Sequence, residues 1–312
     1  MMGALHSSPE AGPELQLSIL IVTYNSRKTI YTCISSLLEE LRSLEAEIIV
    51  VDNNSTDGTP EALTELAAEH RSIHIELNSK NRGFAAGNNQ ALEQARGRDI
   101  LILNPDTEAQ KGSIVGLLDE LHRDDHIAVV APQLQFPDGR VQKTCRRFPR
   151  YRDVIFHSLG LAQVFPDSRL LNGWKMGDFD HESRMAVDQP AGAALLFRGE
   201  VLRELQGFDP SFPMFFNDVD LCRRIRDKGY EIWFLPEHKM FHVGGASVKQ
   251  VKLKMVLSSH ISFFRYFEKH FTRLHQQPLN FFIAILLYLS LIPRMLALLI
   301  QKPKDESSRD TL

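Results

Sequence analysis

Three apolar segments, each ending in polar residues, decide the fold: LSILIVTYNS (17–26), EIIVVDNNSTDGT (47–59) and DILILNPDT (99–107). Short, continuous apolar runs of this kind are typical of strands buried on both faces of a sheet. Helical patterns separate them, near residues 30–44 and 85–96. Strands that alternate with helices predict an α/β fold, in which a parallel sheet is covered by helices on both faces.

The composition excludes several classes of protein. The chain has 312 residues, of which 43% are hydrophobic and 24% charged, as in an ordinary folded domain. Its 36 lysines and arginines are outnumbered by 39 acidic residues, which argues against nucleic-acid binding. The three cysteines form no CxxC pair, so neither a zinc knuckle nor a disulfide framework is predicted. A reducing, cytoplasmic compartment is expected.

The two ends of the chain differ in character. Residues 1–16 lack the basic and apolar regions of a secretory signal, so we expect a disordered tail there. Residues 279–300 form an apolar run close to the length of a membrane span. We favour membrane contact for this run because it is apolar on all sides. Spanning the bilayer and lying in its interface both stay open, since Arg294 lies within the run.

The segment before this run, residues 260–274, predicts an amphipathic helix. Its expected apolar face consists of Phe264, Phe267, Phe271 and Leu274, and its expected basic face of Arg265, Lys269 and Arg273. That pattern suits the surface of an anionic membrane. Packing on the protein's own core is an equally good interpretation.

Polar residues follow each predicted strand at its carboxyl end, where ligands bind in parallel α/β sheets. The clusters are Thr23-Tyr24-Asn25, Asp52-Asn53-Asn54, Asn81-Arg82-Gly83 and Asn104-Pro105-Asp106. Asp106 is suited to a divalent cation that bridges nucleotide phosphates, and the alternative is a simple β-turn. Asp52 is suited to the imide N–H of uracil or thymine, and the alternative is a helix-capping loop. Arg82 and Gly83 suit a phosphate or a helix entry.

Two further residues carry chemistry beyond these clusters. Asp218, in FFNDVDLCRR (215–224), is expected in the first turn of a helix, where the dipole favours its ionised form. A plain cap is the alternative for Asp218, and pairing with Arg224 is the preferred interpretation of Asp220. His242 follows a strand and precedes two glycines, which leave it accessible.

In order along the chain, the sequence resembles family 2 glycosyltransferases of the GT-A fold, in particular the rhamnosyltransferase-like branch of bacterial cell-envelope synthesis. The matching stretches are SILIVTYNS, IIVVDNNSTDGT, NRGFAAGNNQAL, ILILNPDT, QPAGAALLFR, GFDPSFPMFFNDVDLCRRIRDKGY and HVGGAS. Seven weak motifs in the family's order make a strong signal. The resemblance implies a mixed, mostly parallel sheet and inverting sugar transfer from a nucleotide-diphosphate donor, a dTDP- or UDP-sugar.

The resemblance also implies roles for individual residues. Asp218 matches the general base, Asp106 the metal-binding carboxylate, and His242 a histidine that joins the metal site in some members. The implied cofactor is Mg²⁺ or Mn²⁺. The implied donor-binding residues are Thr23, Tyr24, Asn25, Asp52, Asn54, Arg82, Gly83, Asn104, Gly192 and Ala193. Asn217 departs from the family, because a Glu is usual there.

The domain organisation follows from these matches. We expect a catalytic domain over residues 17–247, with a nucleotide-binding half (about 17–130) and an acceptor half (about 131–247), and a membrane-associating extension over 248–312. A glycan or lipid-linked acceptor, membrane contact through 261–300 and a place at the cytoplasmic face of the bacterial inner membrane are expected. The alternatives are a sugar-1-phosphate nucleotidyltransferase and a non-catalytic nucleotide-sugar-binding protein.

Overall fold

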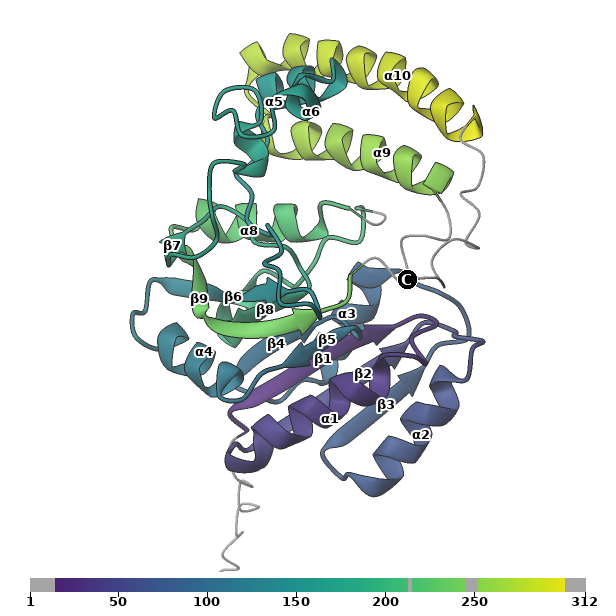
Figure 1. Cartoon of the computed structure of the whole chain (residues 1–312), viewed down its shortest axis with the longest axis vertical. Coiled ribbons are helices and arrows are strands. Elements are labelled where there is room, and N and C mark those ends of the chain that lie inside the picture. Colours follow the sequence, from purple (N-terminus) through teal and green to yellow (C-terminus); the bar gives the residue numbers. More distant parts are fainter. Residues whose placement is uncertain (1–14, 213–214, 245–251, 301–312) are drawn as a thin grey trace, which may run out of the picture.

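The computed structural model describes residues 15–212, 215–244 and 252–300, in which one mixed sheet carries helices on both faces (Figure 1). The strands are β1 (Leu17–Thr23), β2 (Ala46–Asp52), β3 (Ile73–Leu77), β4 (Asp99–Leu103), β5 (Thr107–Ala109), β6 (Ile127–Gln135), β7 (Met185–Ala186), β8 (Ala194–Phe197) and β9 (Glu231–His242). The α-helices are α1 (Ile30–Glu40), α2 (Thr59–Glu69), α3 (Phe84–Gln94), α4 (Ser113–Leu121), α5 (Tyr151–Ser158), α6 (Leu161–Val164), α7 (Gly199–Glu204), α8 (Asn217–Asp227), α9 (Lys252–His270) and α10 (Gln277–Ile300). These elements confirm the predicted α/β class.

The sheet has the strand order β3-β2-β1-β4-β8-β6-β9-β5, and β7 pairs with β9. Its first four strands are parallel, and the register pairs Thr23 with Asp52 and Asp52 with Leu77. Beyond β4 the sheet becomes mixed, because β8 runs antiparallel to both β4 and β6. The carboxyl ends of β1 to β4 therefore lie along one edge, as the sequence predicts.

Two apolar cores flank the sheet, one on each face. Ile19 and Ile21 point into the core formed with α1, α2 and α4, while Leu20 points into the core formed with α3, α7 and α8. Side chains alternate between the faces of a strand, so a continuous apolar run fills both cores at once. Each fully buried aliphatic side chain contributes about 1.5 to 3 kcal/mol by leaving water.

The predicted boundaries are accurate where the apolar runs are clear. The strands expected at 17–23, 73–77 and 99–103 begin and end at those residues. Leu15 and Gln16 were expected in the tail, but their carbonyls accept hydrogen bonds from Arg98 and Asp99. The rest of the predicted tail, residues 1–14, lies outside the described residues.

The pair Thr59-Pro60 predicts a helix start at which the Thr59 hydroxyl is the cap. Helix α2 does begin at Thr59, but that hydroxyl is not its cap. The hydroxyl and the backbone N–H of Thr59 both donate to the carboxylate of Asp57. The carboxylate therefore holds the start of the helix, where the dipole favours a negative charge.

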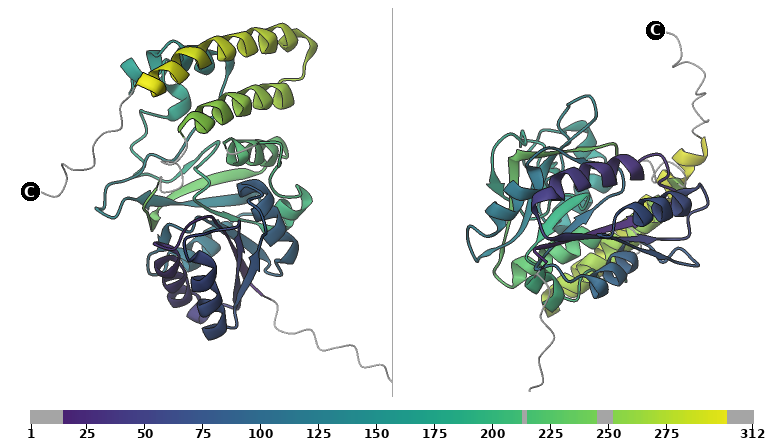
Figure 2. Two further views of the ribbon diagram at one scale, coloured as in Figure 1. Left: turned by 90° about the vertical axis from the view of Figure 1, so that its right-hand side faces the viewer. Right: turned by 90° about the horizontal axis from the view of Figure 1, so that it is seen from below.

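The carboxyl-terminal helices form a layer over α8 (Figures 1 and 2). Helices α9 and α10 pack against each other, and α5 packs against α10. An aromatic core holds this layer to the α/β body. It consists of Val154, Phe212, Phe216, Val219, Phe263, Tyr266, Phe267, Ile283 and Leu287. The fold therefore joins the C-terminal extension to the helix that carries Asp218.

The predicted apolar face of α9 is wrong in part. Phe267 is buried, but Phe264 is 39% exposed, and Leu274 lies beyond the end of the helix. The buried face includes Phe263 and Tyr266, because the partner is α8, with Phe216 and Val219. Lys269, expected on the membrane side, forms ion pairs with two carboxylates of the body instead. Packing on the protein's own core is thus the correct interpretation for this side of α9.

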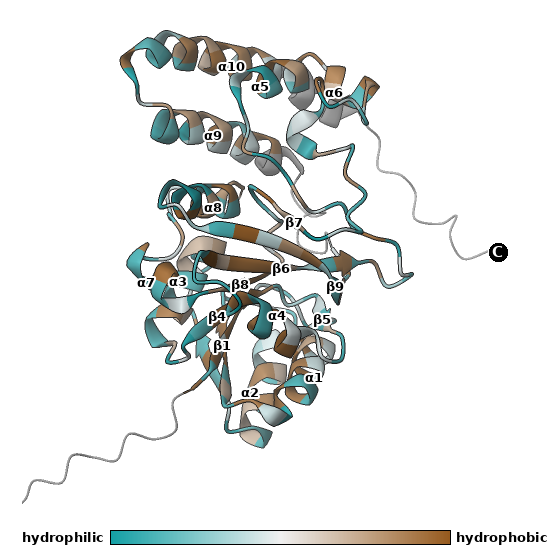
Figure 3. Cartoon of the chain, turned by 90° about the vertical axis from the view of Figure 1, so that its left-hand side faces the viewer, coloured by the Kyte–Doolittle hydropathy of each residue, from teal (hydrophilic) through white to brown (hydrophobic). Residues whose placement is uncertain are grey.

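The opposite side of the layer exposes large apolar residues (Figure 3). Those on α10 are Leu279, Phe281, Phe282, Ile285, Tyr288 and Leu289, each at least 43% exposed. Within the described residues, one stretch, Leu274–Leu291, is long and apolar enough to cross a membrane, and 17% of it is buried in the protein. The side chain of Arg294 lies outside what the structure describes.

Candidate active site

The ends of β1 and β2 are joined by a buried hydrogen-bonded carboxylate. Asp52 is 1% exposed, and its Oδ1 accepts the hydroxyls of Thr23 (2.7 Å) and Ser55 (2.5 Å). Its Oδ2 accepts the backbone N–H of Ser55 at 2.8 Å. The carboxylate therefore shapes the loop after β2. This agrees with the alternative in which Asp52 belongs to a loop that leads into a helix. Contact between Asp52 and a nucleobase stays a prediction.

The loop residues around this carboxylate are partly open to solvent. Tyr24 is 43% exposed, and Asn54 is exposed. Asn25 and Asn54 both have positive φ angles, of 53° and 64°, a conformation that asparagine tolerates better than most residues. The side chain of Asn25 accepts the N–H of Thr56, which holds the two loops together.

Asn53, which the sequence analysis did not single out, ties the loop after β2 to the start of α3. Its side chain is buried, accepts the amide of Asn78 (3.1 Å) and the N–H of Arg82 (3.3 Å), and donates to the carbonyl of Gly83 (3.1 Å). Gly83 has a φ of 85°, which favours glycine. The guanidinium of Arg82 remains exposed and bonds Gln90. The polar clusters that follow β1, β2 and β3 thus form one edge of the sheet.

Asp106 and His242 meet at the same edge. Antiparallel pairing of β5 with β9 places Oδ1 of Asp106 at 3.4 Å from Nε2 of His242, and both side chains are partly exposed. Gln142 fixes the ring: its Nε2 donates to the carbonyl of His242 at 2.6 Å, so its Oε1, 2.9 Å from Nδ1, accepts a hydrogen bond from that nitrogen. Nε2 then faces the carboxylate of Asp106.

This donor set fits a hard divalent cation. A carboxylate oxygen and an imidazole nitrogen face each other, and both atom types are ligands of divalent cations. Within the described ranges, no group of three or more His, Cys, Asp or Glu side chains is placed to hold a metal. Mg²⁺ and Mn²⁺ complete their shells with water and phosphate oxygens when only one or two protein ligands are present.

Asp218 lies in the first turn of α8 as a half-buried carboxylate. Its Oδ2 accepts the side-chain N–H of Gln189 (2.8 Å) and the backbone N–H of Gly192 (3.1 Å), and its Oδ1 accepts the N–H of Val219 (2.9 Å). Desolvation raises the pKa of Asp218, although these hydrogen bonds and the charge of Arg146 act against it. A carboxylate made more basic by burial is suited to accept a proton.

Asp106 and Asp218 are brought together by β8. The N–H of Asn104 donates to the carbonyl of Ala193 at 2.9 Å, and the neighbouring Gly192 donates to Asp218. A Cβ on Gly192 would lie 3.3 Å from Cβ of Asp218, so the two segments are in contact. The dipeptide Gly192–Ala193 therefore lies between the turn that carries Asp106 and the carboxylate of Asp218.

Two residues around Asp218 were missed by the sequence analysis. Gln189 bonds the carboxylate directly, and Arg146 pairs with Gln189 through two backbone hydrogen bonds of 2.7 and 3.1 Å. The basic run KTCRRFPRYR (143–152) was a signal for Arg146, and Gln189 opens the motif QPAGAALLFR, in which no role was assigned to it. Asn217 begins α8, where it is buried.

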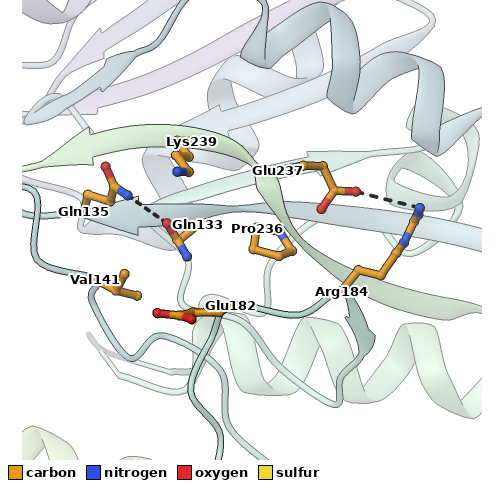
Figure 4. Close-up of a pocket in the computed structure, with 8 residues that line it drawn as sticks. All are labelled: Gln133, Gln135, Val141, Glu182, Arg184, Pro236, Glu237 and Lys239. Carbon is orange, nitrogen blue, oxygen red and sulfur yellow. Dashed lines mark hydrogen bonds and ion pairs between the residues drawn. The ribbon is translucent and has the colours of Figure 1, made fainter.

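A cavity of about 700 Å³ lies away from these groups, between β6, β9 and the loop before β7 (Figure 4). Its lining residues are Gln133, Gln135, Val141, Glu182, Arg184, Pro236, Glu237 and Lys239, most of them polar. Arg184 pairs with Glu237 across it, and Gln135 donates to Gln133. None of the predicted site residues lines it, and it lacks a desolvated carboxylate of the Asp218 kind.

Comparison with known proteins agrees with this geometry. The family description "Glycosyl transferase family 2" matches residues 18–175, which include the carboxyl ends of β1 and β2 and the Asn104-Pro105-Asp106 turn. The chain belongs to this family. The glycosyltransferase is 25% identical over 241 residues to N-acetylglucosaminyl-diphospho-decaprenol L-rhamnosyltransferase of Mycobacterium tuberculosis, covering 72% of this chain and 75% of the relative. It is 26% identical to a low-salt glycan biosynthesis hexosyltransferase of Haloferax volcanii, covering 69% of this chain and 63% of that relative.

Solved structures place this glycosyltransferase in the GT-A fold. A mannosyltransferase of Pyrobaculum calidifontis, solved with GDP-Man and Mn²⁺, superposes with a TM-score of 0.56 at 18% identity, covering 97% of this chain and 80% of that one. GalNAc-T7, solved with UDP, GalNAc and Mn²⁺, gives a TM-score of 0.57 at 16% identity over 74% of this chain and 44% of its own. The enzyme is thus a glycosyltransferase, and the nucleotidyltransferase and non-catalytic alternatives are set aside.

Replacing Asn53 by alanine is expected to destabilise the glycosyltransferase by about 2 to 3 kcal/mol, because buried donors and acceptors lose their partners. Urea denaturation measures the change. Asn54→Gly is the matched control: Asn54 is exposed at a positive φ that glycine adopts freely, so its stability should change by less than about 0.5 kcal/mol. Equal stability of the two variants would contradict the role given to Asn53.

Proposed function

We propose that the enzyme transfers rhamnose or a similar hexose from a dTDP- or UDP-sugar, with inversion, to a hydroxyl of a lipid-linked acceptor in cell-envelope polysaccharide synthesis. The observation that carries the proposal is the desolvated carboxylate of Asp218, bonded by Gly192 next to Ala193, whose carbonyl accepts the N–H of Asn104 in the turn that carries Asp106. A proton acceptor for the acceptor hydroxyl and a site for the leaving diphosphate then lie on either side of one sugar. The similarity to the mycobacterial rhamnosyltransferase supports the choice of sugar and acceptor.

Asp218 acts as the general base in this proposal. It removes the proton of the acceptor hydroxyl as that oxygen attacks the anomeric carbon from the face opposite the diphosphate. The Gln189 and Gly192 N–H groups hold one carboxylate oxygen, so the base keeps a single orientation. Gly192 has no side chain, which lets Asp218 pack closely against this segment.

The carboxyl edge of β1 to β4 binds the donor nucleotide. The residues assigned to it are Thr23, Tyr24, Asn25, Asp52, Asn54, Arg82, Gly83, Asn104, Gly192 and Ala193. Tyr24, Asn54 and Arg82 have exposed side chains and are the residues that meet the ligand first. Thr23 and Asp52 are buried and bonded to each other, so they act by shaping the loop around the nucleobase of the donor.

Asp106 and His242 would hold the divalent cation, Mg²⁺ or Mn²⁺. A bound cation neutralises the charge that develops on the leaving nucleotide diphosphate. Gln142 orients His242 for this role, and the N–H of Gly244 bonds Oδ2 of Asp106 at 3.2 Å. The exposed Arg82 adds positive charge at the same edge.

We propose that the helical layer binds a membrane. The exposed apolar face of α10, together with Phe264 on α9, inserts into the interface of the cytoplasmic leaflet of the inner membrane. Because the other face of α10 packs against α9 through Ile283 and Leu287, we favour lying in the interface over spanning it. A lipid-linked acceptor then reaches the enzyme within the membrane plane.

Replacing Asp218 by asparagine should lower turnover by about 10² to 10⁴-fold, because the base is lost. Nucleotide-sugar binding should survive, as measured by the rise in melting temperature with ligand. In the unmodified enzyme, the rate should fall with decreasing pH through the raised pKa of Asp218, hence above the usual aspartate value of about 4, since only the ionised form accepts a proton. Asp227→Asn, an exposed acid on the same helix, is the control. Near-normal turnover of Asp218→Asn would place the base elsewhere.

Replacing Gln142 by leucine should raise the Mn²⁺ concentration for half-maximal activity by about 10- to 100-fold, because His242 loses the acceptor that fixes its tautomer. The rate at saturating Mn²⁺ should stay near that of the unmodified enzyme. Gln135→Leu is the matched control, since that glutamine lines the separate cavity. Unchanged metal dependence of Gln142→Leu would remove His242 from the metal site.

Replacing Phe281 and Phe282 together by glutamate should lower binding to vesicles containing phosphatidylglycerol by about tenfold or more, since each phenylalanine contributes about 1.5 to 3 kcal/mol when buried. Vesicle flotation measures the bound fraction. Leu77→Glu changes a similarly exposed apolar residue at the end of β3 and should have no effect. Equal flotation of all variants would rule out α10 as the membrane contact.

A further inference from the structure

Arg146 is a partly buried cation beside the base that no carboxylate neutralises. Its Nη1 donates to the carbonyls of Lys143 (2.8 Å), Cys145 (2.7 Å) and Lys175 (3.5 Å). Within the part of the chain that the structure describes, no acidic side chain forms an ion pair with its guanidinium. Burial lowers the pKa of Arg146, and the nearby charge of Asp218 partly offsets this. A desolvated guanidinium without an acid partner is a ready site for an anion.

The next residue provides a contrast. Arg147 donates to the carbonyl of Gly173 at 2.8 Å and lies 3.9 Å from the carboxylate of Asp178. Its bonds tie the chain to the loop at Gly173–Lys175, so Arg147 has a structural role. Both arginines bond carbonyls of the Gly173–Lys175 segment, but Arg147 also has the carboxylate of Asp178 nearby, whereas Arg146 forms no ion pair among the described residues.

Arg146 is linked to Asp218 through Gln189. The backbone of Arg146 pairs with that of Gln189, whose side chain donates to the carboxylate, and the charge of Arg146 acts on the pKa of Asp218. The chain then continues from Arg146 to α5 in the helical layer (Figure 1). The base therefore lies near a cation on the segment that leads to this layer.

The segment that contains Arg146 continues to the apolar face of the layer. Five of the ten residues from Lys143 to Arg152 are basic and none is acidic. Arg150 is exposed at the start of α5, and the hydroxyl of the adjacent Tyr151 donates to Asn280 of α10 at 2.7 Å. A basic path thus connects the base to the helix that exposes Phe281 and Phe282.

We propose that Arg146, with Arg150 further along the path, binds the diphosphate of an acceptor sugar linked to a prenyl chain. This inference rests on the proposed function and names the chemistry of its acceptor. The sugar would lie at Asp218, its diphosphate on the guanidinium one sugar ring away, and its chain along α10. A guanidinium donates two parallel hydrogen bonds to phosphate oxygens, which a lysine ammonium cannot do.

The test is a binding measurement with the full-length protein in detergent micelles. Its donor site is first filled with Mn²⁺ and UDP or dTDP, whichever raises the melting temperature. Farnesyl diphosphate is the probe, and farnesol, which has the same chain without the anion, is the reference ligand. The variants are Arg146→Gln, Arg146→Lys and the control Arg147→Gln. Melting temperatures establish that each variant is folded, and Arg146→Lys keeps the charge if Arg146→Gln is unstable.

Arg146→Gln should weaken farnesyl diphosphate binding by about tenfold or more, as expected for a lost charge-assisted contact, and should leave farnesol binding unchanged. The affinity of Arg146→Lys for farnesyl diphosphate should lie between those of Arg146→Gln and the unmodified protein. Arg147→Gln should bind farnesyl diphosphate normally. If Arg146→Gln instead weakens binding of the nucleotide, Arg146 belongs to the donor site, and the inference is overturned. Unchanged binding of the probe by both Arg146 variants would also overturn it. Because no turnover is measured, this result is independent of the Asp218→Asn test.

Discussion

The antiparallel pairing of β4 with β8 is the constraint on which the rest of the site depends. β4 delivers Asn104 and Asp106 at its carboxyl end, and β8 begins at that same place with Gly192 and Ala193 just before it. Because the two strands run in opposite directions, the end of one meets the start of the other. The Gly192 N–H then reaches Asp218 on α8. A parallel neighbour in the place of β8 would have started at the far edge of the sheet.

The residues that carry charge at this edge are positioned by neutral amide side chains. Asn53 joins two loops, Gln142 sets the tautomer of His242, and Gln189 holds Asp218. Amides satisfy buried donors and acceptors without adding charge, so they orient carboxylates without cancelling them. Burial then makes Asp218 more basic, while the partly exposed Asp106–His242 pair stays open to a ligand.

The helical layer is attached to the catalytic body through the helix that carries the base. Asp220, fully buried two residues after Asp218, bonds Arg224 on its own helix and His270 and Lys269 on α9. Burial alone would raise the pKa of Asp220, but these cationic partners lower it. Helix α9 therefore connects α8 to α10, the helix proposed to contact a membrane. The pairing of Asp220 with Arg224 was predicted from helical spacing, whereas the two α9 partners come from 50 residues further along the chain.

By itself, the sequence determined the α/β class, the strands at 17–23, 73–77 and 99–103, and the polar clusters at their ends, because periodicity and strand direction are local properties. It also singled out Asp106, Asp218 and His242 through their motifs. The pairing of Asp106 with His242 comes from the tertiary structure, since it joins residues more than 100 positions apart. The bonds from Gln189 and Gly192 to Asp218 likewise depend on how α8 packs. The same holds for the buried face of α9, which α8 selects among several apolar stripes, and for Gln142, Gln189 and Arg146. Their residue types are ordinary, and their roles arise from the strand pairing that surrounds them.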